Sequence, residues 1–125
     1  MMKRSSALIF VALISNAAAQ EAAKIDPVDF VVDGRDMLQK RITLAGCHLV
    51  GANQYWVSCR SPSNPTITIP IDAKTLEMED FRRALKECAA YDATERCQGE
   101  VSGVVASGIS GTVGLRNGRI AWTVK

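Results

Sequence analysis

Four cysteines are the residues of this 125-residue chain with the clearest chemistry. They include no Cys-x-x-Cys pair, the spacing that is typical of structural zinc sites. His48 follows Cys47, but neighbouring residues of a strand point to opposite faces, so the two would not share a metal ion. Two disulfides are the favoured use of these cysteines, and three pairings are open in principle.

Among the three pairings, we expect Cys47–Cys59 and Cys88–Cys97. A hairpin centred on Asn53 would place Cys47 directly opposite Cys59. Cys88 lies on the apolar face of an expected helix and Cys97 opens the next strand, so their bond would fix the helix end to the sheet. Closing loops of this size stabilises a fold by roughly 3 kcal/mol each. The alternative is that one pair stays reduced as small buried apolar side chains.

No catalytic constellation stands out in the sequence. His48 is the only histidine, and it is expected to be a partly exposed strand residue. The chain lacks a Gly-x-Ser-x-Gly motif, and paired cysteines leave no thiol nucleophile. Glu77, Glu79 and Asp80 crowd at an expected helix start, where the helix dipole accounts for them. We therefore expect a protein that is not an enzyme and that holds no metal and no cofactor.

Aromatic and basic side chains are the remaining functional signal. Tyr55, Trp56 and Arg60 fall in one expected strand, and Arg116 and Arg119 flank Asn117-Gly118. Aromatic rings can stack on bases or sugars, and arginines can bind phosphates or carboxylates. These five residues are the candidate ligand-binding set. The alternative for Tyr55 and Trp56 is that one lies in the core and the other on the surface, because strand neighbours alternate.

The elements that must position these side chains are mostly strands. Alternation and turn signals predict strands over Arg41–Val50, Tyr55–Arg60, Thr66–Ile71, Cys97–Ser107, Val113–Arg116 and Arg119–Val124. The last two flank Asn117-Gly118, which is a strong hairpin signal. Gly46 indicates a bulge or bend in the first of these strands, and Pro70 favours an edge position for the third. A shorter strand is expected over Pro27–Val32.

One helix is expected between the third and fourth of these strands. Thr75 can cap it, and it ends near Ala90. Met78, Phe81, Leu85 and Cys88 recur at helical spacing and predict its buried face.

A single helix between the third and fourth strands is the order of the OB-fold, a small five-stranded Greek-key barrel. The stretch Lys40–Val50, the Gly-x-Val pattern of Gly99–Val105 and the Asn117-Gly118 pair resemble the tRNA-anticodon-binding-like OB-fold proteins of bacterial envelopes, across roughly Val28–Val124. The resemblance implies a mainly β domain over residues 37–125, with a ligand face on strands two and three. That family's name records a fold similarity rather than tRNA binding, and the four cysteines argue against a cytosolic tRNA role.

The first residues have the three parts of a cleavable secretory signal. Lys3 and Arg4 precede the apolar run Ala7–Ile14, and Ala17-Ala18-Ala19 offers a cleavage site before Gln20. The apolar run is much shorter than the roughly 20 residues of a membrane-spanning helix. We therefore expect a signal peptide over residues 1–19 and a periplasmic mature protein.

Processing changes the charge of the chain. It has 15 basic and 13 acidic residues, and Lys3 and Arg4 leave with the signal, so the mature chain is formally neutral. Residues 20–36 are expected to form a flexible acidic leader, which leaves the remainder positive and a local basic face open. A neutral domain lacks the broad positive field of nonspecific nucleic-acid binders. We expect a non-catalytic binding or adaptor module for an envelope protein, peptide or glycan, with single-stranded nucleic-acid binding as the disfavoured alternative.

Overall fold

The computed structural model describes residues 22–92 and 94–125, so the expected signal peptide lies outside the described residues. The six strands are β1 (Ala23–Ile25), β2 (Arg41–Val50), β3 (Trp56–Arg60), β4 (Thr68–Asp72), β5 (Gln98–Ile109) and β6 (Thr112–Trp122). Helix α2 (Pro27–Asp33) follows β1, and helix α3 (Met78–Glu87) lies between β4 and β5. Two short 3-10 helices, η1 (Gly34–Met37) and η2 (Glu95–Cys97), precede β2 and β5. The expectation of a mainly β domain with a helix after the third main strand is confirmed.

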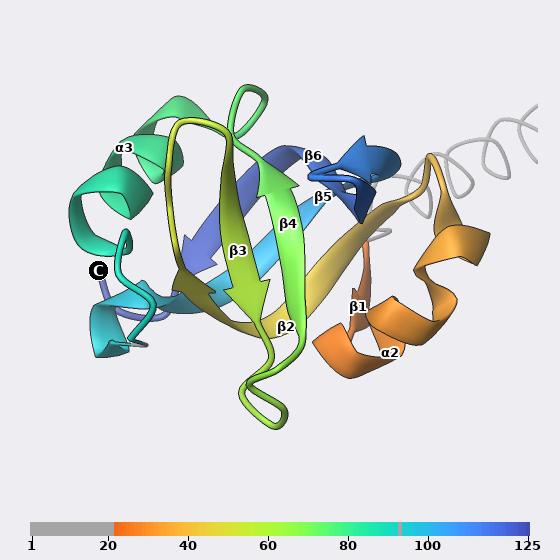
Figure 1. Cartoon of the computed structure of the whole chain (residues 1–125), viewed down its shortest axis with the longest axis horizontal. Helices are drawn as coiled ribbons and strands as arrows, with labels where there is room; N and C mark the ends of the chain where they lie inside the picture. The colour runs from red at the N-terminus through yellow and green to blue at the C-terminus, as the bar shows by residue number, and fades with distance from the viewer. Residues whose placement is uncertain (1–21, 93) are drawn as a thin grey trace, which may run out of the picture.

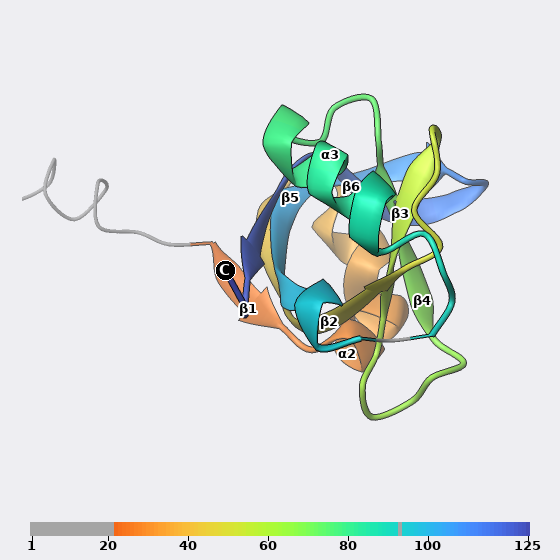
Figure 2. The ribbon, with the colours of Figure 1, turned by 90° about the vertical axis from the view of Figure 1, so that its left-hand side faces the viewer.

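All six strands belong to one mixed sheet in the order β1-β2-β3-β4-β6-β5, and β2 also pairs with β5. The five strands other than β1 therefore form a near-closed ring, called the strand ring below. Its pairs are antiparallel except for β4 with β6, and β1 adds to β2 in parallel. Helices α2 and α3 lie on opposite sides of these strands (Figure 1), and Figure 2 shows α3 across the side nearer the viewer.

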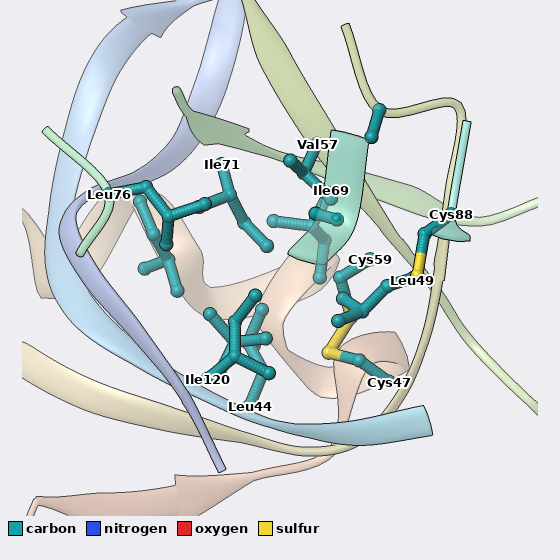
Figure 3. Close-up of a cluster of buried hydrophobic side chains, with 14 of the residues drawn as sticks. Leu44, Cys47, Leu49, Val57, Cys59, Ile69, Ile71, Leu76, Cys88 and Ile120 are labelled. Atoms are coloured by element: carbon teal, nitrogen blue, oxygen red, sulfur yellow. A yellow bond between two sulfur atoms is a disulfide. The ribbon is translucent and has the colours of Figure 1, made fainter. Parts of the chain in front are cut away.

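The hydrophobic core fills the inside of the strand ring because alternate residues of each strand point inward. Figure 3 shows these side chains converging around the Cys47–Cys59 disulfide. Apolar strand residues that are almost fully buried include Ile42, Leu44, Leu49, Val57, Ile69, Ile71, Val101, Val105 and Leu115. Most of the intervening residues are exposed or half-buried, and they carry the surface described below.

Residues Pro27–Val32 are helical, so the strand expected there is wrong. The Asp26 carboxylate caps the helix by accepting a hydrogen bond from the Val28 amide at 2.8 Å, and Pro27 provides a backbone angle suited to the first turn. The apparent alternation misleads because, of Val28, Phe30 and Val32, only Phe30 is buried, at 2% exposure, whereas Val32 is 75% exposed. Within the expected leader, the described residues thus contribute β1, α2 and a core side chain.

Helix α3 is shorter than expected, and its cap is Glu77 rather than Thr75. The Glu77 carboxylate accepts hydrogen bonds from the amides of Glu79, at 2.6 Å, and Asp80, at 3.2 Å. The Thr75 hydroxyl instead donates to Asp72 Oδ2 at 2.8 Å. Thr75 therefore organises the chain before the helix.

The packed face of α3 also differs from the expected one. Phe81 and Cys88 pack against the core as expected, together with Ala84, whereas Met78 is 70% exposed and Leu85 is 40% exposed. The Asp80 carboxylate explains the rotation, because it accepts hydrogen bonds from the amide of Ile120 at 2.8 Å and from the indole nitrogen of Trp122 at 3.0 Å. The helix is thus held on β6 by a polar contact that the apolar pattern does not reveal.

Asn117-Gly118 lies inside β6, so the hairpin expected there is wrong. The β5–β6 hairpin turns instead at Ser110-Gly111. The β5–β6 register shifts between Ser102 and Val104, which pair with Arg119 and Arg116, so Asn117 and Gly118 together face one residue of β5. Asn117 adopts a φ of 52°, a left-handed conformation that asparagine tolerates. The dipeptide therefore forms a β-bulge, which uses the same backbone preference as a hairpin turn.

Strand β4 lies between β3 and β6, so the edge position expected from Pro70 is wrong. Pro70 pairs with Ser58 of β3, and the bridge to β6 joins Ile71 and Leu115. The missing amide hydrogen of proline is tolerated because the pairing with β6 is confined to this short stretch.

Both expected disulfides are present, Cys47–Cys59 with a Cα–Cα distance of 5.0 Å and Cys88–Cys97 with one of 5.8 Å. The β2–β3 register from which we predicted Cys47–Cys59 is wrong, because Leu49 rather than Cys47 lies opposite Cys59. Cys47 and Leu49 share the inward parity of β2, so Cys47 reaches Cys59 diagonally. Gly46, with a φ of 73°, lies where the β2–β5 register shifts, which confirms the bulge expected at this glycine.

Candidate functional site

Tyr55 and Trp56 form an aromatic pair at the start of β3. The Asn53 side-chain oxygen accepts hydrogen bonds from the amides of Tyr55 at 2.8 Å and Trp56 at 3.1 Å, which fixes the turn before the strand. The two ring centroids are 5.8 Å apart with an interplanar angle of 43°. Tyr55 is 55% exposed and Trp56 is half-buried on the outer face of β3. Neither ring belongs to the hydrophobic core, so the alternative of one core and one surface aromatic does not hold.

A shallow hollow of about 210 Å³ lies beside this pair. We call it the aromatic hollow; its lining residues are Tyr55, Trp56, Asp72, Lys74, Gly108, Ile109 and Ser110. Asp72 is the direct cross-strand partner of Trp56, and the last three residues come from the tip of the β5–β6 hairpin. The hollow thus joins an aromatic surface to a carboxylate, an ammonium group and a hydroxyl.

Close approach of two backbone segments shapes the wall of the aromatic hollow. A Cβ atom at Gly114 would lie 2.2 Å from the carbonyl oxygen of Pro70 and 2.9 Å from the Cβ of Ile109. Only glycine allows β6 to approach β4 this closely while Ile109 folds over it. This contact holds the hairpin tip against β4, and therefore next to Trp56 and Asp72.

The polar groups of the aromatic hollow keep unused hydrogen-bonding capacity. Asp72 Oδ2 accepts from the Thr75 hydroxyl, which in turn accepts from the Asn117 amide at 2.8 Å. Within residues 22–92 and 94–125, Asp72 Oδ1 and the Lys74 ammonium group form no hydrogen bond or ion pair. A ligand ring stacked on Tyr55 or Trp56 could therefore donate to Asp72 and accept from Lys74.

Arg60 lies away from the aromatic hollow, at the other end of β3. It lies four positions along the strand from Trp56, a distance of about 13 Å. Its guanidinium donates to the carbonyl oxygen of Tyr91 at 2.6 Å. The Tyr91 ring in turn covers Gly51, where an added Cβ would lie 2.8 Å from Cε1 of the tyrosine. Arg60 thus fixes the segment after α3 against the β2–β3 turn.

Arg116 and Arg119 lie on the outer face of β6. Arg116 donates to Gln39 Oε1 at 3.1 Å, and Arg119 lies opposite Ser102 of β5. Neither residue lines the aromatic hollow. The five candidate residues therefore occupy three places: Tyr55 and Trp56 at the hollow, Arg60 at the other end of β3, and Arg116 with Arg119 on β6.

Sequence reasoning missed the companions of the aromatic pair, Asp72, Lys74 and Ile109. Asp72 and Lys74 follow the expected third strand, and Ile109 lies between two expected strands. The cross-strand position of Asp72 opposite Trp56 could be found only from the β3–β4 register.

The other titratable candidates have structural partners. Glu77 caps α3, Glu79 pairs with Arg82, and Asp80 binds β6. His48 is half-buried between Arg60 and Gln98 on the neighbouring strands. In the part of the chain that the structure describes, no three His, Cys, Asp or Glu side chains are grouped to hold a metal ion.

Glu87 and Arg96 form a charged pair at the end of α3. A hydrogen bond from Arg96 lowers the pKa of the Glu87 carboxyl, and the same contact raises the pKa of Arg96. Neither side chain lines the aromatic hollow. Their contact therefore concerns the stability of the domain.

No family model matches the chain, and neither the curated proteins nor the solved structures gave a match. The two disulfides indicate an oxidising, extracytoplasmic location. Among the described residues, no helix has the length and apolar character needed to span a membrane. The molecule is thus defined as a mainly β domain with a six-stranded mixed sheet and two disulfides.

Proposed function

We propose that this chain is an exported, non-catalytic binding or adaptor module that takes a protein, peptide or glycan ligand in the aromatic hollow. The observation that carries the proposal is the Tyr55–Trp56 pair, held by Asn53 beside Asp72 Oδ1 and the Lys74 ammonium group, which have no hydrogen-bond partner among the described residues. Exposed aromatic rings with polar groups around them are a common basis of recognition, because they combine apolar contact area with hydrogen bonding.

The proposed fold assignment supports this location. The strand ring β2-β3-β4-β6-β5, with α3 between β4 and β5, has the strand order of an OB-fold Greek-key barrel. OB-folds bind ligands on their second and third strands and on the adjoining first–second and fourth–fifth loops. In this chain those parts are β3, β4, the β2–β3 turn and the β5–β6 turn, and they border the aromatic hollow. The proposed relationship to the envelope OB-fold proteins rests on the same order.

Export is part of the proposal. Residues 1–19 have the pattern of a cleavable signal, and the two disulfides are consistent with the periplasm that this signal implies. Intact-mass measurement of the exported protein should give a chain that starts at Gln20. A mass that retains residues 1–19 would contradict this route.

Single-stranded nucleic-acid binding is the second candidate function. The same aromatic pair could stack on bases, and the OB-like strand order is shared with many such proteins. The neutral mature charge and the extracytoplasmic location favour the first candidate over this one.

The experiment is an NMR titration of the isotopically labelled protein recovered after export of the full-length chain. The probes are a hexamer of N-acetylglucosamine, a random decapeptide mixture and the oligonucleotide dT12. The glycan or the peptides should shift the amide signals of Tyr55, Trp56 and Ser110, and Tyr55→Ala should weaken the response. Met78→Ala is the control, because Met78 is a large exposed side chain on α3. Shifts with dT12 alone would favour the second candidate, and shifts confined to other surfaces would refute the proposed site.

A further inference from the structure

A second surface, separate from the aromatic hollow, lies on the outside of β2, β5 and β6. We call it the basic face; its residues are Arg41, Thr43, Ser102, Arg116 and Arg119. The buried residues Ile42 and Val101 alternate with them on β2 and β5, so Arg41, Thr43 and Ser102 point outward. All three arginines are exposed.

Strand register arranges these residues in two rows across three strands. Arg41 pairs with Val104, which pairs with Arg116; Thr43 pairs with Ser102, which pairs with Arg119. Neighbouring strands lie about 4.8 Å apart, so the backbones of Arg41 and Arg116, on either side of β5, are about 10 Å apart. Along the strands, the two rows are about 7 Å apart. The hydroxyl groups of Thr43 and Ser102 therefore share a row with Arg119, next to the row that holds Arg41 and Arg116.

The β-bulge in β6 is what places two arginines on the same face. Arg116 and Arg119 are three positions apart, and in a regular strand residues at an odd separation point to opposite faces. The extra residue at Asn117-Gly118 restores the outward direction of Arg119. Gly118 faces inward, where an added Cβ would lie 3.2 Å from Leu76 Cδ1. The bulge thus aims Arg119 outward while the core stays filled.

The positive charge of the basic face is not neutralised by its surroundings. Among the described residues, none of its three arginines forms an ion pair. Arg116 donates to the neutral side chain of Gln39, and Arg41 donates to the Asn117 carbonyl oxygen at 3.3 Å. The nearby carboxylate of Glu100 pairs with Lys24 at 3.4 Å. The guanidinium groups therefore keep donors for an external anion.

We propose that the basic face binds a linear anionic polysaccharide, whose repeated carboxylate, sulfate or phosphate groups meet the three arginines. Three arginines at set register positions on neighbouring strands suit an extended chain with regularly spaced anions. Thr43 and Ser102 add hydrogen-bonding groups suited to sugar hydroxyls. Nucleic acid is disfavoured because the residues of this face include no aromatic ring for base stacking, and because the disulfides indicate an extracytoplasmic location.

The test uses a heparin dodecasaccharide as the probe and measures its dissociation constant at low and at physiological salt. The triple variant Arg41→Gln, Arg116→Gln and Arg119→Gln should bind at least ~10-fold more weakly, since one hydrogen bond to a charged group can be worth about tenfold. The control removes the same charge elsewhere, through Arg35→Gln, Arg82→Gln and Lys86→Gln, and should change binding less than ~2-fold. Failure of the unmodified protein to bind heparin at low salt, or equal losses in the two triple variants, would overturn the proposal.

Two further comparisons keep the result interpretable. Arg119→Gln alone should weaken heparin binding measurably, and it should leave thermal stability unchanged because the Arg119 side chain makes no hydrogen bond to the described residues. Tyr55→Ala should leave heparin binding unchanged; a loss there would refute a separate basic face. Tighter binding of dT12 than of heparin at the same salt would show that the basic face binds nucleic acid rather than a polysaccharide.

Discussion

Replacing Phe30 by alanine should destabilise the domain by about 3 kcal/mol or more. The side chain is 2% exposed and belongs to the hydrophobic core. Its ring packs against Gly34, where an added Cβ would lie 3.3 Å from two ring carbons. Substitutions of buried phenylalanine by alanine cost about 3–5 kcal/mol through lost burial and the remaining cavity. We expect the lower part of this range, because a single short helix can partly close the cavity.

Urea unfolding followed by circular dichroism measures this loss. Val32→Ala is the control, since Val32 is on the same helix but 75% exposed, and its substitution should change stability by about 0.5 kcal/mol or less. A folded domain is stable by only about 5–15 kcal/mol, so the Phe30→Ala midpoint should fall clearly. Equal midpoints for the two variants would show that α2 is not packed into the core, and the reasoning would be refuted.

Three other predictions concern what holds the domain together. Non-reducing peptide mapping should find Cys47–Cys59 and Cys88–Cys97, and the double variant Cys88→Ala and Cys97→Ala should lower the free energy of unfolding by about 3 kcal/mol, because the disulfide restricts the unfolded chain. Asp80→Ala should cost about 2–3 kcal/mol by leaving the Ile120 amide and the Trp122 indole without their acceptor, whereas Glu79→Ala should change stability little; equal losses would contradict the role of Asp80. The hydrogen bond from Arg96 lowers the pKa of the Glu87 carboxyl in the folded state. This contact should therefore stabilise the domain at pH values above the ordinary pKa range of glutamate, and the stabilisation should be lost as the pH falls through the lowered pKa of Glu87. Glu87→Gln should flatten that acid dependence of the unfolding midpoint, and an unchanged pH profile would contradict it.

The sequence predicted most of the strands because their signals are local, and the Cys47–Cys59 pairing was correct although the register behind it was not. Alternation alone indicates which residues of β2 face inward, and it is independent of the partner strand. Asn117-Gly118 shows where this reasoning fails, because the same left-handed preference serves a hairpin turn or a bulge. Only the pairing with β5 decides between them. The prediction of a strand at Pro27–Val32 was wrong because the apolar alternation of Val28, Phe30 and Val32 was given more weight than the helix-capping signal before it. That signal is Asp26 followed by Pro27.

The candidate site was predictable only in part, for a similar reason. Tyr55 and Trp56 stand out in the sequence as neighbouring aromatics of one expected strand, but their companions depend on contacts between distant segments. Asp72 reaches Trp56 through the β3–β4 register, and Ile109 reaches the hollow through closure of the strand ring. Arg60 looked like a ligand group, yet its guanidinium is used by the carbonyl oxygen of Tyr91, a partner that sequence spacing does not indicate.

Site-specific photocrosslinking tests the central claim, that the ligand occupies the aromatic hollow, most directly. A benzoylphenylalanine replaces Tyr55 in one variant and Met78 in another, and cells that produce either variant are irradiated. The account predicts a crosslinked peptide or glycan adduct at position 55, competed by excess unmodified protein, and none at position 78. Equal adducts at both positions, or no competed adduct at position 55, would contradict it.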